Sequence, residues 1–209
     1  MLMRKFFVGV LAALLVSSCS SSPEVYNITP EGVGPIKIGM NIKDVPEAIE
    51  GLYDHIEVVT TPESYDEMND ETIPAFDTYY FMLGEEKMFS TDPSTDGVIS
   101  FIKTFSPKLS YNGVYAGMSC REVLASQKAK LTAWGTYASC EFYCCFSSDV
   151  PNIEFVVPLN NGGFFTDGSY DKVFNLSMKM SGDSYESYEL NIAPEDIREE
   201  ATITEVQIQ

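Results

Sequence analysis

The sequence predicts an α+β fold of two tandem units, each a helix followed by an antiparallel meander, with the helices packed on one side of the sheet. One reason is that a short stretch occurs twice, as IGMNIKDV at 38–45 and AGMSCREV at 116–123, with the two Gly-Met pairs 78 residues apart. The other reason is that apolar residues after each copy first recur with helical spacing and then alternate with a period of two. The first unit is therefore placed at 25–107 and the second at 108–209.

The first unit is predicted to open with a turn and a short strand. Two glycines and a proline in GVGP at 32–35 exclude a helix, so they predict a turn that leads into a strand at 36–38. Gly39 then lets the backbone change direction. Asn41 is a suitable helix N-cap, and Asp44 lies three residues later, which is the arrangement of a capping box.

A helix is predicted to follow, because apolar residues from 42 to 56 are spaced by three, four or seven. Pro46 lacks a backbone N–H, so we expect a kink or a split in this helix. The rest of the unit reads as strands at 55–60, 76–83, 87–90 and 98–105.

The second unit repeats this order. Ser119 and Glu122 stand in the places of the cap and the acid, and the apolar spacing predicts a helix at 120–131. Proline in the first turn predicts a short helix at 194–200. Strands are predicted at 137–146, 153–159, 173–180, 185–192 and 202–208.

The N-terminal residues predict a signal peptide at 1–18. Arg4 and Lys5 precede 11 apolar residues, FFVGVLAALLV at 6–16. A membrane-spanning helix needs about 20 residues, so this run is too short to span and fits the apolar region of a secretory signal. It ends in VSSC at 16–19, which resembles the lipobox of bacterial lipoproteins. An ordinary cleaved signal peptide with a chance cysteine is the alternative.

The lipobox resemblance implies that Cys19 carries the lipid, palmitate included, and that the membrane is a partner through this anchor. Residues 19–24 then form a lipidated tether. Ser20 follows the cysteine, and by the sorting rule of lipoproteins the absence of an acid there implies the outer membrane. The side that the protein faces is left open.

The composition of the chain excludes one class of binding partner. The chain has 31 acidic and 13 basic residues, for a net charge of −18, and no cluster of basic residues with aromatics. We therefore expect no binding to nucleic acid. The 44% of apolar residues argues against a disordered chain despite this charge.

The strand, the Gly-Met pair, the small capping residue, the acid and the valine resemble the recurring signature of small envelope lipoproteins. These include the small lipoprotein of the outer-membrane β-barrel assembly machine. Two such units in tandem resemble the β-lactamase inhibitor protein, and GVGPIKIGM at 32–40 resembles uncharacterised lipoproteins of Gram-negative envelopes. The resemblance implies a protein-binding or scaffold module, and it brings no catalytic residues with it.

Four further cysteines allow three complete disulfide pairings, and an oxidising envelope permits them. The inhibitor-type fold ties its helix to its sheet, which implies a candidate disulfide between Cys120 and Cys140. The alternative is that the cysteines are free and act as small buried residues. No histidine lies near Cys140, Cys144 and Cys145, so a metal site is not predicted.

Aromatic residues provide the candidate partner-binding surface. The strands at 76–83 and 137–146 are apolar on both faces, and a glycine-rich loop at 160–168 holds two phenylalanines. The alternative is that these rings fill a thin core. The candidate residues are Tyr79, Phe81, Tyr143, Phe164 and Phe165.

The sequence contains no evident catalytic set. His55 is the only histidine, and no nucleophile motif accompanies it. Acidic residues crowd the loop at 63–71, but without the spacing or the glycine of a calcium loop. We therefore expect a non-catalytic module that binds another envelope protein and needs no cofactor. The alternative is a small-ligand or glycan-binding, or hydrolytic, lipoprotein that uses acidic and tyrosine residues.

Overall fold

The computed structural model describes residues 26–66, 70–136, 141–157, 164–171, 175 and 188–209. The predicted signal peptide, the tether and Cys19 lie outside these residues, as does most of the strand predicted at 173–180. Asn175, the described residue of that predicted strand, is helical. In the part of the chain that is described, no helix is long and apolar enough to cross a membrane.

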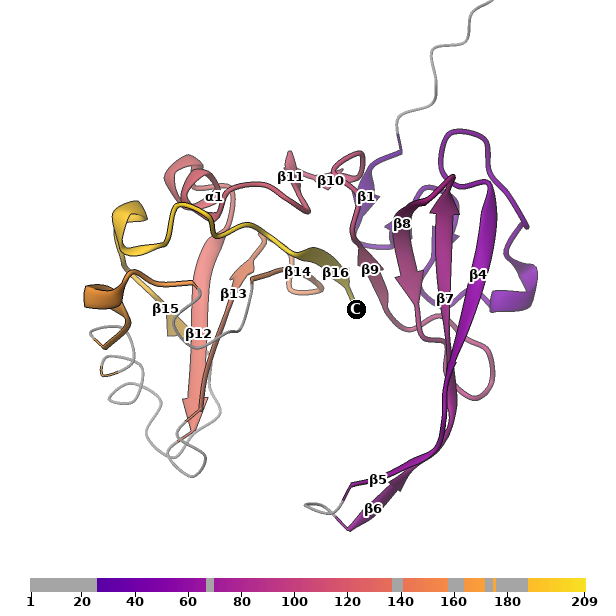
Figure 1. The fold of residues 1–209 in the computed structure, drawn as a ribbon. Coiled ribbons are helices and arrows are strands. Elements are labelled where there is room, and N and C mark those ends of the chain that lie inside the picture. Colours follow the sequence, from indigo (N-terminus) through magenta and orange to yellow (C-terminus); the bar gives the residue numbers. More distant parts are fainter. Residues whose placement is uncertain (1–25, 67–69, 137–140, 158–163, 172–174, 176–187) are drawn as a thin grey trace, which may run out of the picture.

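One antiparallel sheet of nine strands runs through both halves of the chain (Figure 1). In spatial order its strands are β15 (Tyr188–Glu189), β12 (Lys130–Thr136), β13 (Glu141–Ser147), β14 (Ile153–Val156), β16 (Glu205–Ile208), β9 (Ile102–Thr104), β8 (Glu86–Thr91), β7 (Phe76–Leu83) and β4 (His55–Thr61).

Short strands outside the large sheet form three small sheets. The first comprises β1 (Ile28–Thr29), β2 (Gly32–Val33) and β3 (Ile36–Lys37), the second β10 (Ser110–Tyr111) and β11 (Val114–Tyr115), and the third β5 (Ser64–Asp66) and β6 (Glu71–Ile73). The third sheet is a hairpin at the end of a ribbon that β4 and β7 extend away from the body (Figure 1).

The predicted α+β class with two helix-plus-meander units is wrong, because the protein is mostly β and the first of the two predicted helices is absent. In its place stands one turn of 3₁₀-helix, η1 (Ile42–Asp44). Val45 ends this turn in an extended conformation (ψ 129°), as steric clash with the ring of Pro46 requires. Part of the apolar spacing that predicted a helix comes from Leu52 and Tyr53. These residues lie in a turn, and their side chains are buried in the core.

The second predicted helix is confirmed as α1 (Cys120–Ser126), but it is shorter than 120–131. Gln127 adopts a left-handed conformation (φ 55°) that ends the helix, and β12 begins at Lys130. Asn41 caps η1 as expected, because its side-chain oxygen accepts from the backbone N–H of Lys43 at 3.1 Å. Ser119 makes no such bond at the start of α1.

Most predicted strands are confirmed within one to four residues of their limits. The strand at 76–83 is β7 itself, and those at 55–60, 87–90 and 202–208 contain or overlap β4, β8 and β16. The short helix predicted at 194–200 is the 3₁₀-helix η2 (Pro194–Asp196). The strand β12 was not predicted.

The two Gly-Met stretches make the same backbone hydrogen bonds. Each glycine N–H donates to an isoleucine carbonyl at 2.7 Å, and the N–H of that isoleucine donates back to the methionine carbonyl at 2.9 Å. The glycines have φ values of +86° and +95°, which disfavour any residue with a Cβ. Each stretch therefore links two segments that are distant in the sequence through a pair of backbone hydrogen bonds. The residues concerned are Gly39, Met40 and Ile99 in one copy, and Gly117, Met118 and Ile203 in the other.

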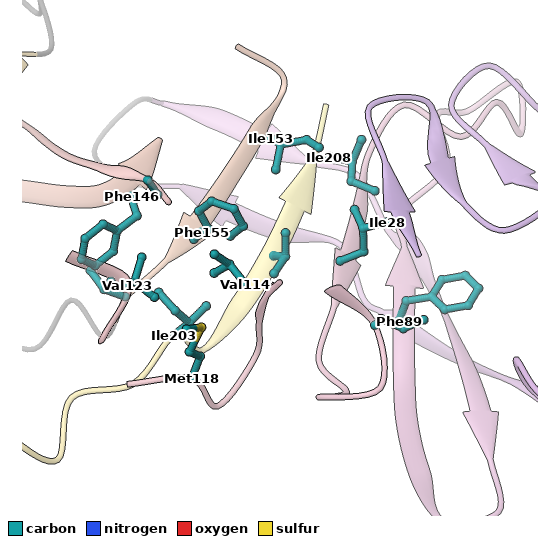
Figure 2. Close-up of a cluster of buried hydrophobic side chains, with 14 of the residues drawn as sticks. Ile28, Phe89, Val114, Met118, Val123, Phe146, Ile153, Phe155, Ile203 and Ile208 are labelled. Carbon is teal, nitrogen blue, oxygen red and sulfur yellow. The ribbon is translucent and has the colours of Figure 1, made fainter. Parts of the chain in front are cut away.

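The hydrophobic core lies against one face of the large sheet (Figure 2). Residues opposite each other in adjacent strands share a face, so the strand register defines rows that cross the sheet. One row is buried in seven of its eight positions, with Ile56 half-buried at its end. The row consists of Ile56, Phe81, Phe89, Thr104, Val206, Phe155, Phe146 and Leu131.

The two halves of the sheet meet at a short seam. β16 pairs with β9 through three residue pairs, and those pairs join parts of the chain about 100 residues apart. Ile102 and Ile208 are fully buried there, so the core continues across the seam without a break.

Candidate functional site

The structure corrects the placement of three predicted partner-binding residues. Phe164 and Phe165 are 3% and 2% exposed, their rings contact each other, and the ring of Phe164 also contacts Phe146. Phe81 is fully buried and stacks on Phe89 with ring centroids 4.2 Å apart. These three rings therefore belong to the core, as the alternative interpretation of the aromatic residues held.

The other two candidates have different outcomes. Tyr79 is half-buried on the core side of β7, at the border between the core and the surface. Tyr143 lies in β13, but its side chain is outside the described part of the structure, so its role stays a prediction.

The face of the sheet opposite the core carries a second continuous row. We call this row the open face. It is mostly polar and half-buried or exposed, with one fully buried serine in the middle, and it contains acids at two positions and lysines at two others. It consists of Glu57, Tyr80, Ser90, Lys103, Gln207, Glu154, Ser147 and Lys130.

Lysines lie over aromatic rings in the first half of the open face. The Nζ of Lys87 is 4.2 Å from the ring centroid of Tyr80, and that of Lys103 is 5.2 Å from the ring centroid of Phe101. Such cation–π contacts hold flexible lysine side chains against flat rings. At the far end, Lys130 forms an exposed ion pair of 2.9 Å with Glu189. The open face thus combines ordered aromatic groups with separated charges of both signs.

A cleft of about 470 Å³ opens beside η1, where the ends of β4 and β7 meet the loop at 93–97. Apolar contributions come from Ile42, Phe76 and Tyr79. Asp77 lies at its edge and accepts a hydrogen bond of 2.6 Å from the Thr60 hydroxyl. The volume falls within the range of small-molecule sites, which is about 300 to 1,000 Å³.

The strand β4 forms one edge of the large sheet and is exposed along most of its length. Val58 and Val59 point to opposite faces and are 51% and 50% exposed. Phe76, across from the end of β4, is 42% exposed. The other edge strand, β15, has only two residues in the described part of the chain. Among the described residues, the sheet therefore has one long exposed edge, at β4, and one short edge, at β15.

His55 begins β4 and contacts two carboxylates. Its Nδ1 lies 2.5 Å from Asp54, and its Nε2 lies 3.6 Å from Glu57. The hydrogen bond with Asp54 raises the pKa of His55, while the backbone N–H of Gly84 is the first of several donors that lower the pKa of Asp54. The imidazole is therefore held by carboxylates at an exposed position, and the contacts described for it include no serine or cysteine nucleophile.

Two cysteine side chains are described, and neither is activated as a nucleophile. Cys120 is a buried free thiol, and burial raises its pKa to about 12, so it stays protonated at neutral pH. Cys145 is also free, and burial raises its pKa. Cys140 lies outside the described residues, so its pairing with Cys120 stays a prediction. The described residues contain no cluster of His, Cys, Asp and Glu that is suited to a metal ion.

Comparison with known proteins adds little to this geometry. No protein-family profile matches the chain, and no curated protein matches it. Among solved structures it is similar to the crystal structure of the uncharacterized protein yfeY from Escherichia coli. The TM-score is 0.44 at 10% identity, over 88% of this chain and 99% of the other. A likeness of this extent carries no argument about function.

Sequence reasoning missed the open face and the exposed edge. Both depend on which strands are neighbours and in which register, and these pairings join residues far apart in the chain. One local feature could have indicated the exposed edge. The strand predicted at 55–60 contains two adjacent valines at 58–59 and no lysine, proline or glycine.

Proposed function

We propose that this chain is a non-catalytic, lipid-anchored module of the bacterial envelope that binds another envelope protein through the open face. The observation that supports the proposal is the row of eight register-matched residues that crosses the sheet on the side away from the core. Tyr80 is of a residue type that is enriched in protein interfaces, and the cation–π contact with Lys87 holds that lysine against its ring. The mixed charges favour a partner that is selected by matched charges rather than by apolar area alone.

Site-specific photocrosslinking in cells tests this proposal. A photoreactive phenylalanine analogue is placed at Tyr80, Glu154 or Gln207 on the open face, and at Glu122 or Glu199 as exposed control positions on helix and loop. We expect the same adduct from all three open-face positions and none from the controls. Absence of an adduct at the open-face positions, with normal protein levels, would refute the use of this face.

The anchor is tested separately. In the lipoprotein interpretation, Cys19→Ser abolishes labelling by an alkyne analogue of palmitate and releases the protein from the membrane fraction. A variant that stays in the membrane and keeps its processing unchanged would show that Cys19 is not the anchor. Equal labelling of the wild-type protein and the Cys19→Ser variant by the palmitate analogue would also show that Cys19 is not the anchor.

The cleft beside η1 favours a second candidate function, the binding of a small ligand or glycan. It brings a carboxylate, a hydroxyl and aromatic rings together in a volume suited to a small molecule. Ligand-observed NMR with oligosaccharides of N-acetylglucosamine tests this function. Binding that is lost in Asp77→Asn but kept in Asp92→Asn would support it, and no transfer of saturation to any sugar would remove it.

A further inference from the structure

The long open edge of the sheet points to a second mode of recognition. We propose that β4 accepts an extended segment of another protein as an additional antiparallel or parallel strand, and that this segment has two adjacent apolar residues flanked by basic residues. The contact uses the backbone edge of β4, which contributes only Glu57 to the open face, so it goes beyond the function proposed above and is tested independently of it.

The first argument is the exposure of the edge backbone. A strand at the edge of a sheet leaves half of its N–H and C=O groups facing outward, and natural proteins protect such edges with short strands, lysine, proline or bulges. β4 has seven residues, HIEVVTT, without lysine, proline or glycine. The described irregularity of the register lies between β7 and β8, at Phe81 and Met82, and not at β4. β4 thus lacks lysine, proline and bulges, and its one acid, Glu57, is compatible with a basic partner strand.

The second argument is the exposed apolar surface on both faces of the edge. Val58 and Val59 are each about half exposed and lie on opposite faces. An added strand would place one apolar side chain beside each of them, since directly opposite residues have Cβ atoms about 5 Å apart. The edge is therefore suited to a strand with apolar residues on both faces, and recognition of this type takes its affinity from backbone hydrogen bonds.

The third argument is charge, and it selects the occupant. Residues 44–86 contain 13 aspartates and glutamates and no lysine or arginine. They include β4, β7 and the β5–β6 hairpin, so the ribbon that carries the edge contains acids and no lysine or arginine. Like charges disfavour a second copy of this chain at the edge, and they disfavour an anionic lipid surface. A segment with lysine or arginine fits this charge.

The position of Asp77 adds a specific contact. Thr60 and Asp77 are opposite each other in β4 and β7, so a residue paired with Thr60 would share a row with both. Strands are about 4.8 Å apart, which puts the new Cβ about 10 Å from that of Asp77. A lysine or arginine side chain spans this distance to the carboxylate at the edge of the cleft. We therefore expect a basic residue at the position opposite Thr60.

A synthetic decapeptide in which pairs of lysines alternate with pairs of valines, blocked at both ends, is the probe. The whole protein in detergent is mixed with the peptide, and amide hydrogen exchange is followed at 55–61. We expect exchange of the outward-facing amides of β4 to slow at least tenfold on binding. Two peptides with N-methyl groups on alternate residues, one for each edge of the peptide, provide the backbone control. Each loses one hydrogen-bonding edge, and we expect at least one of them to bind at least tenfold more weakly.

Protein variants separate the edge from general charge attraction. Val58→Lys with Val59→Lys adds two positive charges at the edge, and Tyr65→Lys with Ile73→Lys adds the same two charges on the hairpin. All four positions are between 42% and 58% exposed, so the fold should tolerate both pairs of changes. We expect the first variant to lose peptide binding at least tenfold and the second to lose less than threefold.

Several results would overturn the proposal. Equal binding of the unmodified and both N-methylated peptides would show charge attraction without strand pairing. Equal binding of a glutamate–valine peptide would remove the charge argument. Protection of β4 that depends on protein concentration and not on peptide would assign the edge to a second copy of the chain. Loss of the open-face crosslinks, in contrast, would leave this proposal standing.

Discussion

Replacement of Phe81 by alanine gives the clearest test of whether the aromatic residues of β7 form core or binding surface. Phe81 is fully buried, stacks on Phe89 at 4.2 Å and meets the ring of Tyr53 edge-on at 4.9 Å. Phenylalanine-to-alanine changes in protein cores lower the free energy of unfolding by about 3 to 5 kcal/mol. Each aromatic pair that is lost contributes roughly 0.5 to 1.5 kcal/mol. We therefore expect the free energy of unfolding to fall by about 4 kcal/mol.

Phe76→Ala is the matched control, because it makes the same change five residues earlier in the same strand, at a side chain that is 42% exposed. Its cost should stay below about 1 kcal/mol. Urea unfolding followed by circular dichroism measures both values, and the melting temperature of Phe81→Ala should fall by roughly 10 °C. A typical domain has about 5 to 15 kcal/mol of stability, so the variant should still fold. Equal losses in the two variants would refute the assignment of Phe81 to the core.

Three further predictions follow from single residues. The hydrogen bond that His55 donates to the Asp54 carboxylate raises the pKa of His55, so NMR titration of the one imidazole should give a value above its ordinary 6.5, and Asp54→Asn should lower it. Any stabilisation from this pair should be present below pH 6.5 and be lost as the pH rises through the folded-state pKa; a wild-type titration at or below 6.5 would contradict this. Cys120, with its pKa raised to about 12 by burial, should resist iodoacetamide at pH 8 until urea unfolds the protein, as mass spectrometry would detect; rapid labelling of the folded protein would contradict this burial. Arg198 donates from Nε to the carbonyl of Phe165 at 2.8 Å, so Arg198→Ala should lower the free energy of unfolding by about 1 to 3 kcal/mol, and a loss below about 0.3 kcal/mol would show that this bond contributes nothing.

Strands were more predictable than helices here, for local reasons. β7 was predicted at its observed limits because its apolar residues on both faces follow one after another between turn signals. The prediction of the first helix was wrong because apolar spacing alone does not distinguish a helix from a turn in which Leu52 and Tyr53 are buried. Pro46 was expected to bend the helix, whereas steric restriction of the preceding residue ended the helical turn there.

The functional surfaces were less predictable, because they depend on contacts between distant residues. Two phenylalanines in a glycine-rich loop fit an exposed recognition loop as well as a plug for the core, and only packing against Phe146 distinguishes these cases. The open face joins eight strands in register. The pairing of Lys103 with Gln207 at its middle links residues more than 100 positions apart, and no local pattern indicates it.

The seam between β9 and β16 has a consequence for assembly. Its three residue pairs form only after a closure of about 100 residues, which makes their formation slow relative to the hairpins on either side. Until then, β9 and β16 each have one edge whose backbone groups are unpaired. A β16 from a neighbouring molecule offers the same four side chains in the same register, so exchange of this strand would preserve every native contact of the seam. At high concentration during refolding, domain-swapped dimers joined at β9 are therefore the misassembled product that this topology favours.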